Sequence, residues 1–242
     1  MEQVKPDKTK EAGKKEQVEA MFDSIANRYD FLNHFLSLGI DKIWRRTAIK
    51  MLSGRKIENL LDVATGTGDF AIEASKIPGV KITGIDISEN MLAIGKEKVQ
   101  KIGLANRINL EHGDSESLKL ETNFFDAVTV AFGVRNFENL QQGLSEMNRV
   151  LKPGGVAVIM EFSKPASFPF KQVYNFYFKY ILPIIGRIIS KDKSAYIYLP
   201  ESVKNFPDGE EFIRIFSEAG FKNCSIKLLT FGVASIYAGE KK

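Results

Sequence analysis

A glycine-rich loop between an apolar run and a helical pattern constrains the fold more than any other feature of this sequence. The run IENLLDVA leads into TGTGD and then into FAIEASKI, whose apolar residues keep a helical spacing. Gly66 and Gly68 lie in the loop, where the backbone turns sharply and a ligand can approach closely. Asp86 ends the next predicted strand, KITGID, where its carboxylate can accept both hydroxyls of a ribose. The spacing predicts a nucleotide-type ligand.

The rest of the chain alternates strands and helices. The helices are predicted at 89–103, 139–153 and 208–221, and the strands at 57–64, 81–86, 107–114, 124–133 and 156–162, with two closing strands around Gly232. Such alternation is typical of a mostly parallel sheet covered by helices on both faces. We therefore predict a Rossmann-like α/β fold with seven strands.

The composition excludes several classes of protein. The 242 residues are 44% hydrophobic and 26% charged, and the net charge of +4 does not by itself indicate nucleic acid binding. One cysteine and two histidines leave no disulfide and no thiolate or imidazole metal cluster. No run reaches the roughly 18 apolar residues of a transmembrane helix, and the polar N-terminus lacks the apolar region of a signal peptide. We expect a cytoplasmic protein, soluble or peripheral at the inner face of the membrane.

The sequence also suggests a division of the chain. Residues 1–17 are polar and are expected to form a flexible tail, followed by a single domain over 18–242. Within that domain, 18–52 is predicted to be helical, broken at Gly39, and 164–206 is an aromatic and basic insertion after the fifth strand. Oligomeric state is left open, and a homo-oligomer is compatible with the sequence.

Two features favour S-adenosylmethionine over a nicotinamide dinucleotide as the ligand. Asp62 lies near the end of the first strand, where a nicotinamide site usually keeps an apolar residue, and its carboxylate can organise the loop around an ammonium group. RVLKPGG at 149–155, taken with the glycine loop, Asp86 and the acidic turn HGDSES at 112–117, resembles class I methyltransferases in content and order. Asp114 in that turn is the candidate beside the adenine amino group, and a solvated turn residue is the alternative.

Over nearly the whole chain from residue 18, the sequence resembles the ubiquinone/menaquinone biosynthesis C-methyltransferases. YDFLNHFLSLGIDKIW matches the first signature of that family, RVLKPGGVAVIMEFS matches the second, and FGVRN at 132–136 also matches. Three positions depart from the pattern, since Leu32 replaces a Met, Asp41 replaces a His, and Ala131 replaces a Ser that contacts the cofactor in some members. The resemblance places four residues at cofactor-binding positions: Thr67, Asp86, Asp114 and Ser115.

The resemblance implies that the protein adds a methyl group to a ring carbon of a reduced polyprenyl quinone. Arg135 cannot act as a base, because guanidinium stays protonated, and is expected to stabilise the developing phenolate. Asn136 is expected to hold a quinol oxygen. His34 is the candidate general base, with a structural histidine as the alternative. Since no acceptor motif for nucleobases and no basic RNA-binding segment is found, a nucleic acid partner is not predicted.

Demethylmenaquinol is the preferred acceptor, because the polar N-terminus without a transit peptide resembles bacterial members of the family. The ubiquinone precursor, a 2-polyprenyl-6-methoxy-benzoquinol, is the first alternative, and a small-molecule O- or N-methyltransferase is the second. An NAD-dependent oxidoreductase leaves Asp62 and RVLKPGG without a role. A non-enzymatic quinone-binding or membrane-surface protein would not need the complete glycine loop.

The segment PFKQVYNFYFKYILPIIGRII at 169–189 is predicted to be an amphipathic helix that ends or kinks at Pro183. Residues 164–193 carry six Lys or Arg and one acid, which favours contact with an anionic membrane surface. We interpret the segment as a lid that covers the quinol ring and guides the isoprenoid tail. The alternative is a helix packed into ordinary core.

Overall fold

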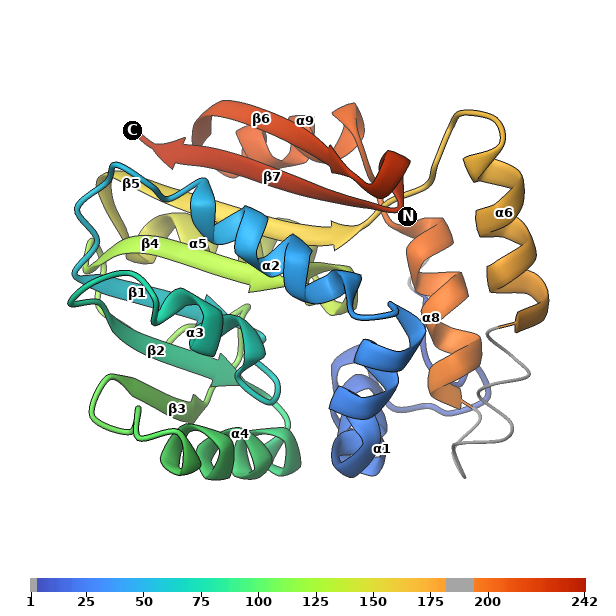
Figure 1. Cartoon of the computed structure of the whole chain (residues 1–242), viewed down its shortest axis with the longest axis horizontal. Helices are drawn as coiled ribbons and strands as arrows, with labels where there is room; N and C mark the ends of the chain where they lie inside the picture. Colours follow the sequence, from blue (N-terminus) through green and yellow to red (C-terminus); the bar gives the residue numbers. More distant parts are fainter. Residues whose placement is uncertain (1–3, 182–193) are drawn as a thin grey trace.

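The computed structural model describes residues 4–181 and 194–242, which contain one seven-stranded sheet in the order β3-β2-β1-β4-β5-β7-β6 (Figure 1). The first five strands pair in parallel, and β7 runs antiparallel to both of its neighbours. This confirms the predicted mostly parallel sheet. The strands are β1 (Asn59–Val63), β2 (Lys81–Asp86), β3 (Ile108–His112), β4 (Phe125–Ala131), β5 (Leu151–Phe162), β6 (Phe221–Leu229) and β7 (Ala234–Lys241).

Helices cover both faces of the sheet, with α2 and α3 in front of it and α5 and α9 behind it in the view of Figure 1. A second group, α1, α6 and α8, lies beyond the carboxyl ends of the parallel strands. The described helices are α1 (Lys14–Leu36), α2 (Ile40–Lys50), α3 (Asp69–Ala74), α4 (Glu89–Lys101), α5 (Leu140–Val150), α6 (Phe170–Phe176), α8 (Ser194–Asn205) and α9 (Glu210–Glu218), with short turns η1 (Val134–Asn136), η2 (Tyr177–Ile181) and η3 (Thr230–Gly232).

The core has two layers because successive strand residues point to opposite faces of the sheet. Leu60 and Val158 belong to the cluster under α2, α3 and α4, whereas Leu61 and Ile159 belong to the cluster under α5 and α9. All four side chains are fully buried. The central strands therefore read as continuous apolar runs, as is usual for a parallel sheet covered on both sides.

The boundary between α5 and β5 differs from the prediction. The helix was expected to continue to Pro153, but it ends at Val150 and β5 begins at Leu151. Leu151 pairs with Phe125 of β4, and the register of this pairing then shifts. A proline is tolerated at such an irregularity because its missing N–H removes no regular ladder bond.

The N-terminal part of the chain packs against the helices at the carboxyl edge of the sheet. Helix α1 begins at Lys14, earlier than the expected start at 18, and Val4 is buried in a third apolar cluster with residues of α1 and α8. The division into a tail and one domain stays a prediction. Of the expected lid, residues 182–193 with Pro183 and Asp192 lie outside the described residues, and none of the described helices has the length and hydropathy to cross a bilayer.

Candidate functional site

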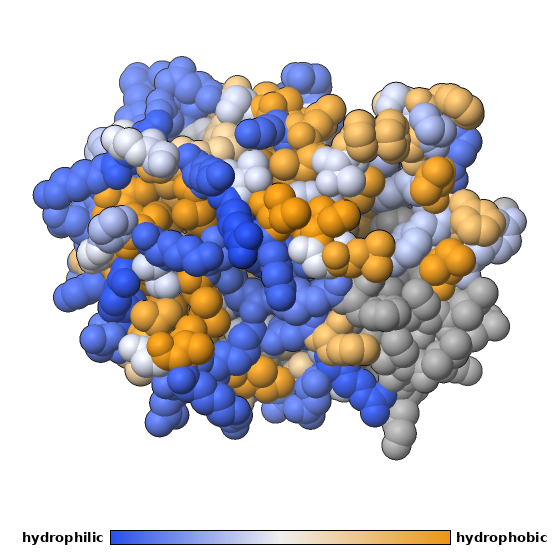
Figure 2. Space-filling model, in the orientation of Figure 1, coloured by the Kyte–Doolittle hydropathy of each residue, from blue (hydrophilic) through white to orange (hydrophobic). Residues whose placement is uncertain are grey.

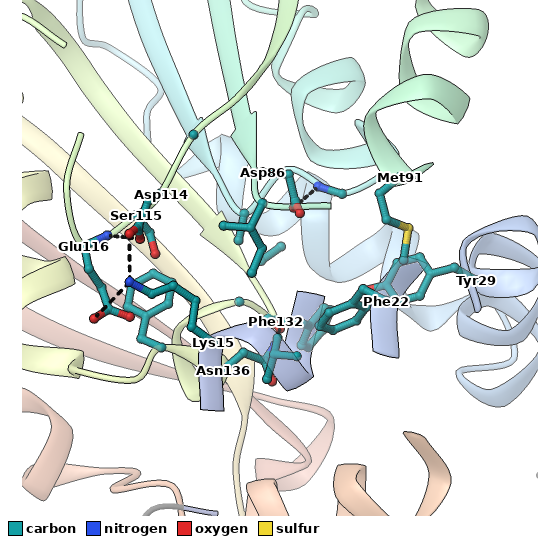
Figure 3. Close-up of a pocket in the computed structure, with 18 residues that line it drawn as sticks. Lys15, Phe22, Tyr29, Asp86, Met91, Asp114, Ser115, Glu116, Phe132 and Asn136 are labelled. Atoms are coloured by element: carbon teal, nitrogen blue, oxygen red, sulfur yellow. Dashed lines mark hydrogen bonds and ion pairs between the residues drawn. The ribbon is translucent and has the colours of Figure 1, made fainter. Parts of the chain in front are cut away.

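A hollow opens at the glycine loop, where β1, β2 and β4 end. We call it the loop pocket (Figure 3). It brings together five of the residues predicted from the sequence, although they come from four separate segments of the chain: Gly66, Asp86, Asp114, Ser115 and Asn136. Helix α1 supplies the opposite wall through Lys15, Val18, Phe22 and Tyr29.

The floor of the loop pocket is a hydrogen-bonded turn around Asp86. Gly66 has a φ of 56°, a left-handed conformation that favours glycine, and its N–H donates to Oδ2 of Asp86 at 2.8 Å. The N–H of Ser88 donates to Oδ1 at 2.9 Å. Each carboxylate oxygen keeps a lone pair for a further donor, so the residues present fit a ribose diol. Burial raises the pKa of Asp86, partly offset by these backbone bonds.

Asp62 supports the loop from below and does not line the pocket. Its side chain is 1% exposed and accepts hydrogen bonds from the hydroxyls of Thr65 and Thr129, both at 2.7 Å. Burial raises the pKa of Asp62 to about 6. The acid therefore ties the glycine loop to β4, and its expected role in organising the loop around an ammonium group stays a prediction.

Helix α1 closes the end of the pocket that carries Asp114. Nζ of Lys15 lies 2.7 Å from Oδ2 of Asp114 and 3.9 Å from Oε2 of Glu116 (Figure 3). The neighbouring Lys14 is buried and donates to the backbone oxygens of Arg135 and Phe137 at 3.0 and 2.6 Å. Sequence reasoning missed both lysines, because they lie in the range expected to be a tail and their partners are about a hundred residues away in the chain.

Thr67 and Gly68 do not reach the loop pocket. Thr67 is 2% exposed and its hydroxyl donates to Asp30 of α1. Gly68 has a φ of 79° and lies where a Cβ would contact Leu110. These two residues therefore shape the loop from the side away from the hollow.

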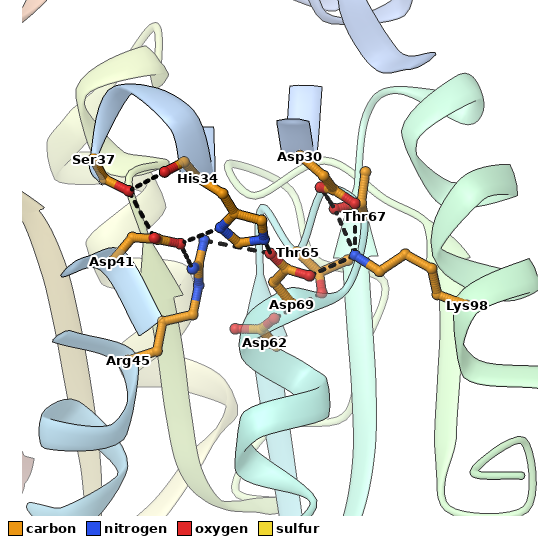
Figure 4. Close-up of polar contacts among 10 residues, drawn as sticks. All are labelled: Asp30, His34, Ser37, Asp41, Arg45, Asp62, Thr65, Thr67, Asp69 and Lys98. Atoms are coloured by element: carbon orange, nitrogen blue, oxygen red, sulfur yellow. Dashed lines mark hydrogen bonds and ion pairs between the residues drawn. The ribbon is translucent and has the colours of Figure 1, made fainter. Parts of the chain in front are cut away.

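Thr67 belongs to a set of polar contacts that joins α1, α2, α3 and α4 (Figure 4). We define the charged network as Asp30, His34, Asp41, Arg45, Asp69 and Lys98. Lys98 bonds to Asp30 at 2.8 Å and to Asp69, and the two ring nitrogens of His34 lie 2.9 Å from Asp41 and 3.5 Å from Asp69. Although the ligand atoms of His34, Asp41 and Asp69 lie within 4.8 Å of one another, Arg45 and Lys98 already pair with the acids, so this donor set does not fit a metal ion.

A second, larger hollow lies beside α1, and we call it the aromatic pocket. Phe22, Tyr29 and Phe132 line both hollows, so the two spaces share a wall. The aromatic pocket is enclosed by α1, α2, α6, α8 and the loop after β4, and its apolar walls suit a ring with a hydrocarbon chain. Its aromatic lining comprises Phe22, Tyr29, Trp44, Phe132, Phe162, Phe170, Tyr174, Tyr177 and Tyr198.

Arg135 places a cation in the wall of the aromatic pocket. Its side chain is 7% exposed, and Nη1 lies 2.8 Å from Oε1 of Glu161, which is fully buried. Burial raises the pKa of Glu161, and the Arg135 charge opposes this shift. Nε of Arg135 has no hydrogen-bond partner among the described residues. The guanidinium is thus held in place by Glu161 and keeps a free donor.

Asn136 lies on the loop-pocket side, apart from Arg135. Its Nδ2 donates to the backbone oxygen of Phe132 at 3.3 Å, and its buried Oδ1 has no partner in residues 4–181 and 194–242. Phe132 has a φ of 59°, an uncommon conformation for an aromatic residue that costs energy and is often found at functional sites. Arg135 and Asn136 are adjacent in the 3-10 turn η1, where successive side chains point roughly 120° apart, and they line different pockets.

His34 is not brought together with Arg135. It lines neither pocket, and carboxylates face both of its ring nitrogens.

Sequence reasoning also missed Tyr198, a buried member of the aromatic pocket, because a single tyrosine in a helical pattern carries no functional signal.

Comparison with known proteins gives a consistent result. Residues 9–241 match the model of the ubiE/COQ5 methyltransferase family. A Bacteroides fragilis protein named demethylmenaquinone methyltransferase is 49% identical over 241 residues, which cover 99% of this chain and 98% of the relative. A Geobacter sulfurreducens protein named ubiquinone/menaquinone biosynthesis C-methyltransferase UbiE is 49% identical over 230 residues, covering 94% and 90%.

Solved structures of distant sequences share the fold. The [4+2]-cyclase SpnF aligns with a TM-score of 0.67 at 18% identity and covers 95% of this chain and 97% of its own. A Haemonchus contortus phosphoethanolamine N-methyltransferase 2 in complex with S-adenosyl-L-methionine aligns with a TM-score of 0.60 at 18% identity, covering 82% and 52%. At this identity the likeness establishes the fold alone.

Proposed function

The chain belongs to the ubiE/COQ5 methyltransferase family, and on that premise we propose that its two adjoining pockets carry methyl transfer from S-adenosylmethionine to a ring carbon of a polyprenyl quinol, demethylmenaquinol. The observation that carries the proposal is the shared wall of Phe22, Tyr29 and Phe132. It sets a nucleotide-type pocket beside a large apolar pocket that contains a buried cation. A methyl donor in the first and a quinol ring in the second can meet at this wall.

S-adenosylmethionine supplies an electrophilic methyl group when it is bound. Asp86 would hold the ribose hydroxyls, and Asp114 with Ser115 would face the adenine. The amide oxygen of Asn136 is buried and has no partner among the described residues, so it can accept a hydrogen bond from a donor of the cofactor, such as the ammonium group. We therefore assign Asn136 to the cofactor side, in place of the expected contact with a quinol oxygen.

The chain's own contribution to the reaction is to orient the quinol and to stabilise its anion. Once a quinol hydroxyl has given its proton to a water molecule, the ring carbon beside it would take the methyl group from the bound cofactor, with S-adenosylhomocysteine as the leaving group. A second water molecule would accept the displaced ring proton, which restores the aromatic ring. Arg135, fixed by Glu161, can stabilise the phenolate as its charge develops. The apolar walls exclude bulk water, which strengthens this interaction.

Methyl transfer to defined acceptors tests the proposal. The wild-type protein with radiolabelled S-adenosylmethionine should methylate reduced demethylmenaquinone faster than a 2-polyprenyl-6-methoxy-benzoquinol or a soluble phenol. Expression in deletion strains should restore menaquinone. Faster turnover of the benzoquinol would indicate a function in ubiquinone biosynthesis and not in menaquinone biosynthesis. Activity on soluble phenols alone would reject both functions.

Arg135→Ala is expected to lower kcat by about 10²–10³-fold, the usual cost of removing a preorganised charge donor. Calorimetry should show an almost unchanged Kd for S-adenosylmethionine, since Arg135 does not line the loop pocket. Because this change leaves Glu161 buried without its partner, Arg135→Met combined with Glu161→Met serves as the second variant and should fold but remain inactive. Turnover at the wild-type rate in either variant would reject the role of Arg135.

We further propose that the protein works as a cytoplasmic enzyme at an anionic lipid surface, where its substrate resides. Exposed apolar side chains surround the mouth of the aromatic pocket, and two of them, Leu38 (85% exposed) and Val173 (64%), also line it. Phe168, Phe176 and Phe231 add exposed aromatic area near α6, where apolar residues gather in Figure 2. The exposed Lys171 on α6 suits anionic headgroups.

Sedimentation with lipid vesicles tests this surface. Binding should increase with the fraction of anionic lipid and should fall severalfold in Phe176→Asp, whereas Ile102→Asp, which replaces an exposed apolar residue after α4, should bind as the wild type does. Equal losses in the two variants, or no binding by the wild type, would reject the surface without affecting the proposed reaction.

A further inference from the structure

We propose that the hydroxyl of Tyr198 binds a ring oxygen of the quinol directly and is a catalytic residue contributed by α8. This inference rests on the proposed function, since it concerns the acceptor in the aromatic pocket. Tyr198 lies on the helix that follows the insertion after β5, and its side chain is part of the pocket wall. Neither the loop motifs nor the family signatures quoted above include it.

The hydroxyl of Tyr198 is buried without a hydrogen bond. The residue is 2% exposed, and its oxygen has no partner among the residues that the structure describes. Leaving a buried polar group unpaired costs free energy, and nearly all such groups in folded proteins have a partner. A hydroxyl in a pocket wall that lacks a hydrogen-bond partner is explained if a bound ligand provides that partner.

A second donor in the same wall lacks a partner. Nε of Arg135 is also buried and unpaired among the described residues, and both side chains line the aromatic pocket. Burial raises the pKa of Tyr198 well above its ordinary value, opposed by the positive charge of Arg135, so the phenol stays protonated and can donate. The wall thus presents two donors, from η1 and from α8, to a ring that carries two oxygens.

The opposing interpretation is that Tyr198 is only a packing residue, because its ring contributes to the apolar cluster with Val18 and Met21. A phenylalanine would fill that role equally well and would remove the unpaired hydroxyl. Tyr198→Phe therefore separates the two interpretations, because it changes a single oxygen. If Tyr198 only packs, the variant should keep its function. If its hydroxyl binds the quinol, the variant should lose affinity for quinones and turnover of the quinol.

Tyr237→Phe is the matched control. Tyr237 is fully buried, lies outside the linings of the two pockets, and its hydroxyl accepts a hydrogen bond from the N–H of Gly209 at 2.8 Å. The control should lose thermal stability and keep its activity per folded molecule. Tyr198→Phe should show the opposite result, with Tm equal to or higher than that of the wild type, since no bond is lost in the free enzyme.

The experiment measures binding and turnover in both variants. With short-chain demethylmenaquinone as a non-reacting ligand, Tyr198→Phe should raise Kd about 3–10-fold, whereas a prenylated naphthalene that lacks both oxygens should bind both proteins equally. With the quinol, kcat/KM should fall about 10–100-fold because the lost bond would strengthen as negative charge develops. Kd for S-adenosylmethionine should not change.

Two results would overturn the inference: unchanged quinone binding and turnover in Tyr198→Phe, or an equal loss of affinity for the oxygen-free naphthalene. The latter would show that the tyrosine acts through packing. Failure of the wild type to methylate any quinol would instead reject the proposed function, and the binding comparison with quinone and naphthalene would still decide the role of the hydroxyl.

Discussion

Two acidic side chains, the buried Asp62 and the half-buried Asp86, set the shape of the loop pocket before any ligand binds. Asp62 holds Thr65 and Thr129, and Asp86 holds the N–H groups of Gly66 and Ser88. Both acids have a raised pKa because burial disfavours their charged forms. These acids reduce the stability of the folded protein and shape the loop pocket. Acids with shifted pKa values are common at functional sites.

Asp62→Asn is expected to stabilise the cofactor-free protein at neutral pH. The pKa of Asp62 is raised from 3.8 to about 6, so the folded state holds its proton more tightly, and stability is lost as pH rises from about 4 to 6. At neutral pH the ionised Asp62 therefore lowers the free energy of unfolding by up to about 3 kcal/mol. The Asn side chain of the variant cannot ionise, so part of this free energy is recovered. Urea unfolding should show the variant about 1–3 kcal/mol more stable at pH 7.5. The difference should shrink toward pH 4, and a difference that is constant or grows on acidification contradicts the prediction.

At the scale of elements, the charged network couples α1 and α2 to the helices behind the glycine loop. Lys98 of α4 links Asp30 of α1 to Asp69 of α3, and His34 links Asp69 to Asp41 of α2. The network thus fixes the wall that separates the two pockets. We infer that His34 is a positioning residue that holds α1 and is not the general base.

His34→Asn should lower kcat by less than about tenfold, because the amide can still contact one of the two carboxylates, whereas loss of a general base costs about 10²–10⁴-fold. Asp41→Asn, which alters the same network and keeps the histidine itself, should give a loss of similar size. The pH profile of kcat/KM should keep its shape in both variants. A loss of more than a hundredfold confined to His34→Asn, with a flattened acid limb, would restore its role as the base.

The α6 region divides its aromatic side chains between the pocket and the surface. Tyr177 lines the aromatic pocket, whereas Phe176 is 57% exposed and does not. The sequence predicted one apolar face for this helix, but no residue of α6 is buried. The lid role remains a prediction, in which Tyr177 would contact the substrate and Phe176 would contact the surroundings.

Tyr177→Ala should therefore weaken use of long-tailed quinols in detergent more than use of tail-less analogues, since it removes part of the wall. Phe176→Ala should leave kinetics with soluble analogues unchanged and lower activity on vesicle-bound substrate. The comparison is a ratio of kcat/KM for long-tailed and tail-less acceptors in each variant. Equal losses for both acceptors in Tyr177→Ala would mean that the segment only supports the fold.

At the scale of the whole molecule, the two pockets lie between the sheet and the helices beyond its carboxyl edge. Helix α1 contacts both pockets, α6 and α8 close only the aromatic pocket, and the loop after β4 reaches each. A ligand in the loop pocket therefore bridges parts of the chain that are distant in sequence. Such a ligand stabilises the folded state as a whole.

S-adenosylmethionine at a hundred times its Kd should stabilise the protein by about 2.7 kcal/mol. For a chain of this size, that corresponds to a rise in Tm of roughly 5–10 °C. NAD⁺ at the same concentration should produce no shift, because the strand that leads into the glycine loop carries Asp62 where a nicotinamide dinucleotide site usually keeps an apolar residue. Differential scanning fluorimetry checks both, and a shift with NAD⁺ alone would contradict the cofactor assignment.

The sequence by itself determined the order of the strands and helices, the glycine loop and its acids. These depend on local causes: apolar periodicity, the conformational freedom of Gly66, and an acid at the end of the next strand. It also made Arg135 a candidate site residue through the short motif FGVRN. What such patterns report is which residues are near one another along the chain.

Only the tertiary structure decided how the residues are divided between the two pockets. Arg135 and Asn136 are adjacent in sequence but line different pockets, because both lie in the 3-10 turn η1, where successive side chains point roughly 120° apart. Lys15 reaches Asp114 and Tyr198 enters the aromatic pocket through packing between distant segments. Burial, which removes the competing water and sets the pKa of each acid and the cost of each unpaired donor, exists only once the chain is folded.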